Sequence, residues 1–246
     1  MTTDDLTEKS ANVPFDAPFS VRKKYAVTVN DSVAAAAFDG VAYKIPISGY
    51  DENKFYKVTA LINNESVSVE KISGGCIIQA RDVNGDITVS VVEGFKMTYN
   101  PNGGFGDAPS DSAIYAAGEN AYIIFDNAPT MEGKIFVGWT NTNNLTLNTQ
   151  IFTSHKVKYD RNTYILNKES CEYAVNGATE LYALYGALGD ADMNGKLGIE
   201  DISFLIDYIL NRQAPENANA ILADCDENGE IQIGDISRLI DLYLGR

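Results

Sequence analysis

One acidic segment is written twice near the C-terminal end of the chain, at residues 189–201 and 223–235. Each copy contains the pattern Asp-x-Asp-x-Asn-Gly, at residues 190–195 and again at 224–229. Side-chain oxygens at every second residue, followed by a glycine that permits a sharp turn, can surround a hard cation. Because chance does not readily produce two such copies in register, the sequence predicts a pair of calcium sites.

The residue positions of an EF-hand-type loop assign the ligands in each copy. In the first copy the ligands are Asp190, Asp192, Asn194, the backbone carbonyl of Lys196, and Asp201. In the second copy they are Asp224, Asp226, Asn228, the backbone carbonyl of Glu230, and Asp235. The expected cofactor is therefore calcium, with one ion in each loop.

The elements that must position these ligands are two amphipathic helices, one directly after each acidic segment. Apolar residues recur with helical spacing at Ile202, Leu205, Ile206 and Ile209, and again at Ile236, Leu239, Ile240 and Tyr243. Residues 215–222 between the copies can form a short connecting helix. Leu197 and Ile231 hold equivalent apolar positions, and we expect them to pair the two loops.

This region departs in two ways from a helix–loop–helix calcium sensor. No amphipathic helix is expected before either segment, and each segment closes with Asp rather than Glu. Together with the duplication, these features make residues 187–246 resemble a dockerin. The resemblance implies an all-α module with two EF-hand-like calcium loops. It also implies a cohesin module on a scaffolding protein as the partner, and a secreted or cell-surface setting outside a bacterial cell.

The same resemblance implies where the partner binds. Dockerins contact cohesin through the residues just before the last loop ligand and through the helices that follow. The corresponding residues here are Ile199, Glu200, Phe204, Ile233, Gly234 and Arg238. Isoleucine is shared by both repeats, but Glu200 differs from Gly234, and Phe204 differs from Arg238. We therefore expect one binding orientation rather than two.

The sequence before the acidic repeat has the residue pattern of β-strands joined by turns. Residues 1–20 are polar and are expected to form a tail or linker. From 21 to 95, short β-rich runs alternate with turn residues such as Asn63-Asn64, which is typical of a small antiparallel sandwich or barrel. Residues 21–95 are therefore predicted to form one small β module.

Residues 96–186 contain a second series of strands. A strand at 96–100 leads into Asn102-Gly103-Gly104, a Gly-Trp pair follows at 138–139, and Leu181-Tyr182-Ala183 closes the series. This order resembles the Listeria–Bacteroides repeat of bacterial surface proteins, a small β-grasp-like module, and implies a spacer or adhesion role without catalytic residues. Trp139 is expected to anchor a core, with a sugar-binding platform as the alternative.

The composition narrows the classes of function. A formal net charge of −15 argues against a nucleic-acid partner, because phosphate recognition needs clustered Lys and Arg. The sequence has no apolar run long enough to span a membrane, so no membrane partner is expected. Cys76, Cys171 and Cys225 lack a metal-binding spacing. The common nucleophile and metalloprotease motifs are missing too, and an enzyme is not expected.

The predicted fold is thus multi-domain, with two small mainly-β modules followed by an all-α dockerin. The predicted function is non-catalytic attachment of a parent protein to a cohesin, with the β modules as a spacer or stabilising partner. One alternative is that the β modules also bind polysaccharide. A further alternative is that the ions only hold the small helical domain together, because two short helices bury too little apolar area to be secure alone.

Overall fold

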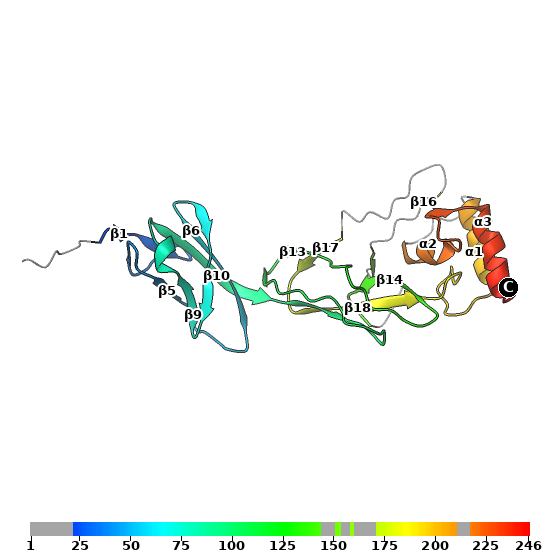
Figure 1. Ribbon diagram of the computed structural model, residues 1–246, viewed down its shortest axis with the longest axis horizontal. Coiled ribbons are helices and arrows are strands. Elements are labelled where there is room, and N and C mark those ends of the chain that lie inside the picture. Colours follow the sequence, from blue (N-terminus) through cyan, green and yellow to red (C-terminus); the bar gives the residue numbers. More distant parts are fainter. Residues whose placement is uncertain (1–21, 144–150, 154–157, 160–170, 211–216) are drawn as a thin grey trace, which may run out of the picture. The chain divides into compact units, whose positions relative to one another are not determined.

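The computed structural model describes residues 22–143, 151–153, 158–159, 171–210 and 217–246 (Figure 1). The chain divides into two compact units. Unit 1 comprises the chain up to Glu52 together with Val58–Val91, and unit 2 comprises Asn53–Lys57 together with Val92–Arg246. The tail predicted at residues 1–20 lies outside the described part of the chain. Among the described residues, no helix has both the length and the apolar character needed to cross a bilayer.

The described residues of unit 1 form short strands and one turn of 3-10 helix. Its elements are β1 (Lys24–Tyr25), β2 (Val27–Val29), β3 (Ser32–Val33), β4 (Ala37–Phe38), β5 (Tyr43–Pro46), β6 (Phe55–Ile62), β7 (Glu65–Val67), β8 (Glu70–Ile72), β9 (Gly75–Ile78), the 3-10 helix Ala80–Asp82 and β10 (Ile87–Phe95), of which β6 and β10 continue into unit 2. The strand orders are β3-β2-β10-β6-β7, β5-β9-β8 and β1-β4. The β6–β7 turn has Asn63 and Asn64 at φ 52° and 68°, as the turn signal predicts.

The core of unit 1 is mainly aliphatic and also includes Tyr25. Val27, Ile45, Ile78 and Ile87 are each at most 1% exposed and belong to one buried cluster. β2 and β10 are neighbouring parallel strands, with Val27 opposite Ile87, so two of these side chains come from adjacent strands. The alternation seen in the sequence therefore corresponds to one buried face per strand.

The β part of unit 2 surrounds an aromatic core. Its strands are β11 (Met97–Asn100), β12 (Tyr115–Ala116), β13 (Glu119–Tyr122), β14 (Ile135–Thr140), β15 (Ile151–Phe152), β16 (Lys158–Tyr159), β17 (Glu172–Val175) and β18 (Thr179–Gly186). The main sheet has the order β11-β18-β14-β15, in which β11 and β18 are parallel. Trp139 of β14 is completely buried between Tyr99 and Phe136, whose ring centroids lie 4.9 and 5.2 Å away.

The C-terminal part of unit 2 carries the acidic repeat. Its elements are α1 (Ile199–Ile209), α2 (Asn217–Ala223), β19 (Glu230–Ile231) and α3 (Ile233–Tyr243). The helices expected after each acidic segment are thus present, and Figure 1 shows α1 and α3 side by side. The connecting helix is present as α2, while its predicted first residues, 215–216, lie outside the described part.

The predicted fold class, with an all-α dockerin and two EF-hand loops at the C-terminus, is wrong. Strands predominate in the described part of the structure, with 40% strand and 15% helix, and the three α-helices described there are short. The C-terminal part also contains β19, which pairs in parallel with β16 of the preceding segment. Its helices share one buried core with Val137 of β14 and Leu184 of β18. Short amphipathic helices bury too little area by themselves, and here they use the neighbouring sheet as well.

Candidate metal centre

The first loop, residues 190–201, follows β18 after a short turn at residues 187–189. The amide of Asp190 donates to the carbonyl of Ala187 at 3.1 Å, and the amide of Gly189 donates to the carbonyl of Leu222 at 2.8 Å. Within the loop Gly195 has φ +83°, a left-handed conformation that glycine adopts at little cost. Its amide donates to Asp190 Oδ2 at 3.0 Å, so the sharp turn closes back onto the first carboxylate.

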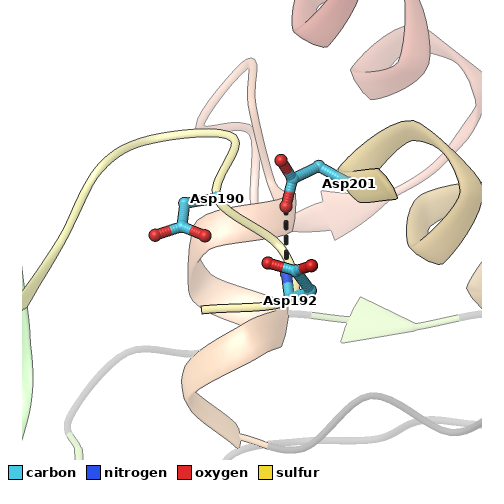
Figure 2. Close-up of side chains that lie close together, drawn as sticks. All are labelled: Asp190, Asp192 and Asp201. Atoms are coloured by element: carbon cyan, nitrogen blue, oxygen red, sulfur yellow. Dashed lines mark hydrogen bonds between the residues drawn. The ribbon is translucent and has the colours of Figure 1, made fainter. Parts of the chain in front are cut away.

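Three carboxylates converge in this loop. Asp190, Asp192 and Asp201 each offer an oxygen, and these atoms lie within 4.8 Å of one another. Figure 2 shows Asp201, at the first turn of α1, close to the two loop carboxylates. Its Oδ1 accepts the amide of Asp192 at 3.1 Å, and its Oδ2 accepts the amide of Gly198 at 2.8 Å. Asp201 therefore caps the helix and joins it to the loop.

Asp190 holds the least compensated polar atom of this loop. The residue is 3% exposed, and its Oδ1 has no hydrogen-bond partner. A buried carboxylate is normally paired, hydrogen-bonded or bound to a metal, because desolvation of a bare charge is costly. An oxygen in this state beside two further carboxylates matches the donor chemistry that a hard divalent cation requires.

The second loop, residues 224–235, repeats the arrangement. Asp224, Asp226 and Asp235 offer oxygens that lie within 4.8 Å of one another. Asp235 Oδ1 accepts the amide of Asp226 at 3.2 Å, and its Oδ2 accepts the amide of Gln232 at 2.8 Å. One difference concerns Asp224, whose two oxygens accept the amides of Asn228 and Gly229 at 3.1 and 2.8 Å.

Burial raises the pKa of two aspartates in each triad. Desolvation is the largest cause that raises the pKa of Asp190, Asp201, Asp224 and Asp235 above the usual range. Neighbouring carboxylates raise these pKa values further, whereas backbone hydrogen bonds lower them. A cation between the carboxylates would relieve the repulsion that the protons otherwise relieve.

The two predicted asparagine ligands lie beside the triads. Asn194 donates from Nδ2 to Asp192 Oδ2 at 2.7 Å and accepts the amide of Lys196 at 2.9 Å. Asn228 likewise accepts the amide of Glu230 at 2.8 Å. The structure thus brings the six aspartates together in two triads, with each asparagine adjacent to its triad. The roles of the Lys196 and Glu230 carbonyls stay predictions.

The predicted partner-facing residues differ in exposure. Ile199 and Ile233 are 65% and 75% exposed, at the first residues of α1 and α3. Glu200 and Arg238 are exposed, and Gly234 is half-buried. Phe204 is half-buried, packs against the shared core and meets the ring of Tyr208 edge-on. Ile199 and Ile233 are therefore the accessible apolar side chains of this face, beside the exposed charges of Glu200 and Arg238.

The expected apolar positions contribute to the shared core to different extents. Ile231 is 6% exposed and belongs to this core, and the half-buried Leu197 packs against it, so both side chains point inward as expected. Direct pairing of the two loops through these residues stays a prediction, and Ile231 also lies in β19, which pairs with β16. The buried face of α1 centres on Leu205 and Tyr208, while Ile206 is 36% exposed. On α3, Leu239 is buried, and Ile240 and Tyr243 are 38% and 50% exposed. Helical spacing marks an apolar stripe but not which part of the stripe the sheet covers.

Trp139 has no face available for stacking a sugar. It is fully buried, and its Nε1 donates to the carbonyl of Ile124 at 3.0 Å. Its interpretation as a core anchor is confirmed. Polysaccharide binding by the β modules stays an untested prediction, and Trp139 cannot serve as its platform.

Comparison with family models, with curated proteins and with solved structures gives no match. The interpretation of the two triads therefore rests on their own geometry and chemistry.

Proposed function

We propose that residues 187–246 act as a calcium-dependent attachment module of the dockerin kind, and that the preceding β structure is its spacer and support. The partner would be a cohesin module on a scaffolding protein, and the setting would be outside a bacterial cell. The observation that carries the proposal is the pair of matched acidic triads, one of which contains the buried, unpartnered Asp190 Oδ1.

The donor set fits calcium. Calcium takes oxygen ligands in flexible geometry and accepts several carboxylates in one site. In the first loop Asp190, Asp192 and Asp201 would hold the ion, with Asn194 beside them, and the second loop repeats this set with Asp224, Asp226, Asp235 and Asn228. When bound, the ion supplies positive charge that neutralises the converging carboxylates. The chain's own residues then fix the loop against the helix start.

The link from metal to attachment is the position of the exposed isoleucines. Ile199 lies two residues before Asp201, and Ile233 lies two residues before Asp235. Each isoleucine is therefore in the same helical turn as a carboxylate that caps the helix and belongs to a triad. Exposed apolar side chains of this kind suit a protein interface. A cation that orders both loops would present the two isoleucines with little further loss of conformational entropy on binding.

The test is a binding screen of the full chain against a panel of cohesin modules, in calcium and in chelator. We expect a panel member to bind in calcium and to be released by chelator. Ile199→Asp and Ile233→Asp should weaken that binding, whereas Val33→Asp, at a 90% exposed position in unit 1, serves as the matched control. Binding that persists in chelator, or a panel without any binder, would contradict the proposal.

A purely structural role for the ions is the competing function, and the same samples separate it. If calcium stabilises the chain but no isoleucine variant alters any interaction, the ions serve the fold alone. The shared core with Val137 and Leu184 shows that the helices already have apolar support from the sheet. That support leaves the exposed isoleucines without an evident structural purpose.

A further inference from the structure

We propose that the two loops are unequal: the second binds calcium first and more tightly, and the first is a weaker site that orders only when its own ion arrives. This inference rests on the proposed calcium binding and adds an order of occupancy to it. It comes from three differences between loops whose ligand residues are otherwise the same.

The first difference is the hydrogen bonding of the leading aspartate. Asp224 Oδ1 accepts the Asn228 amide at 3.1 Å, but the equivalent Asp190 Oδ1 is buried without a partner. Both oxygens of the leading aspartate in the second loop are therefore hydrogen-bonded before any ion binds, one of them through an Asn228 amide that also lies 3.2 Å from Asp226 Oδ1. The first loop in its closed form leaves a charged oxygen uncompensated, so without an ion it should relax to other conformations. Binding of the ion to the first loop is then coupled to ordering of that loop, and the cost of ordering lowers the affinity.

The second difference is the interaction of the next aspartate. In the first loop the side-chain amide of Asn194 donates to Asp192 Oδ2 at 2.7 Å, and an ion must compete with that contact. No side-chain amide donates to Asp226 within the described part of the second loop. The second loop is also fixed from both sides, because α2 ends at Ala223 directly before Asp224, and β19 is paired with β16.

The third difference is charge. Residues 190–201 carry four carboxylates and one lysine, Lys196, whereas residues 224–235 carry five carboxylates and no basic residue. Each loop has three carboxylates in its triad, so the difference lies in the surrounding charge, which attracts a cation more strongly to the second loop. The charges, the amide contact and the prior order of the loop all favour the second site.

The order of occupancy is tested by titrating calcium into the chelator-treated full chain and measuring the heat of binding by isothermal titration calorimetry. The variants Asp192→Asn and Asp226→Asn form a matched pair at equivalent positions. We expect two steps separated by about tenfold or more in affinity. Asp226→Asn should abolish the tighter step and Asp192→Asn the weaker one. Equal affinities, or the opposite assignment, would overturn the inference while leaving calcium binding intact; no binding at all would overturn the proposed function as well.

Amide hydrogen exchange gives a second readout that does not depend on heat. Gly195 and Gly229 are equivalent reporters, since their amides donate to Asp190 Oδ2 and Asp224 Oδ2. In chelator we expect the Gly195 amide to exchange about tenfold faster than the Gly229 amide, and saturating calcium should bring the two rates together. Equal protection in chelator would contradict a preformed second loop.

Discussion

At Asp190 the fold places a carboxylate oxygen beyond the reach of solvent and of any described donor. Leaving a buried acceptor unsatisfied costs about 1–3 kcal/mol, and more for a charged group. This cost is comparable to what one bound ion returns, because a ligand at about 100 times its dissociation constant stabilises a fold by roughly 2.7 kcal/mol. A single residue can therefore decide how strongly this region depends on calcium.

Asp190→Asn should separate these effects. In chelator the variant should be at least as stable as the parent, because it removes a buried charge. In calcium it should lose about 2.7 kcal/mol of the stabilisation gained at saturating ion. Urea unfolding, monitored by the fluorescence of Trp139, the only tryptophan of the sequence, measures the free energy of unfolding in chelator and in calcium. Asp241→Asn on α3, outside both triads, is the control, and an unchanged calcium response in Asp190→Asn would count against the site.

The same carboxyls predict an unusual pH dependence. Burial raises the pKa of Asp190, Asp201, Asp224 and Asp235, so the folded chain binds more protons than the unfolded chain as these groups titrate. Their contribution to stability is therefore present below the ordinary Asp pKa of about 3.9 and is lost as pH rises through the raised values.

In chelator, we expect the free energy of unfolding to fall between about pH 4 and neutral pH, and calcium to suppress this loss. Urea titrations over that range measure it. The double variant Asp190→Asn, Asp224→Asn should show a weaker pH dependence. If the parent and the double variant have the same slope in chelator, the triads are not its source.

At the scale of elements, the contact between β18 and α2 is unusually close. A Cβ added to Gly186 at the end of β18 would lie 2.5 Å from Leu222 Cδ1. Leu222 is fully buried and belongs to the core shared by helices and sheet. Glycine is therefore required at this point by packing rather than by backbone conformation.

Gly186→Ala should destabilise unit 2 by about 1–3 kcal/mol through overpacking. Gly177→Ala, where an added Cβ meets nothing within 4 Å, should be close to neutral. Thermal or urea unfolding of the two variants provides the comparison. Equal stabilities would mean that α2 shifts away from the sheet without cost.

Some of these elements could be predicted from the sequence, and others could not. α1 and α3 follow from local spacing and from Asp201 and Asp235 at their starts, and the six triad carboxylates follow from a local motif. The pairing of β16 with β19 joins two-residue strands far apart in the chain, where propensity carries almost no signal. The fold class failed for the same reason, since no local pattern says that Val137 lies beneath the helices.

At the scale of the whole molecule, the smallest stable attachment unit is expected to include the sheet. Val137 and Leu184 are 0% and 6% exposed in the core that they share with Leu205, Leu222 and Leu239. Burying a Val or Leu side chain stabilises by about 1.5–3 kcal/mol. A fragment of residues 187–246 lacks Val137 and Leu184 and therefore exposes the helical side chains that pack against them. It should be at least about 3 kcal/mol less stable than a fragment of residues 92–246.

Urea unfolding of both fragments in saturating calcium, followed by far-ultraviolet circular dichroism, measures this difference. Leu184→Ala within residues 92–246 should lose about 2–5 kcal/mol and so move the longer fragment toward the shorter one. Fragments of equal stability would show that the helical part is self-sufficient.

The parallel neighbours β11 and β18 give unit 2 a mechanical character. β11 is the first strand of its main sheet, β18 leads into the acidic repeat, and Met97–Asn100 lie opposite Thr179–Tyr182. Pulling the chain at its two ends draws parallel strands in opposite directions, so tension acts on their interstrand hydrogen bonds in shear and loads them together. An antiparallel hairpin pulled from its open end would separate one bond at a time. A chain tethered through its C-terminal loops would thus resist extension at the sheet that also completes the core of those loops.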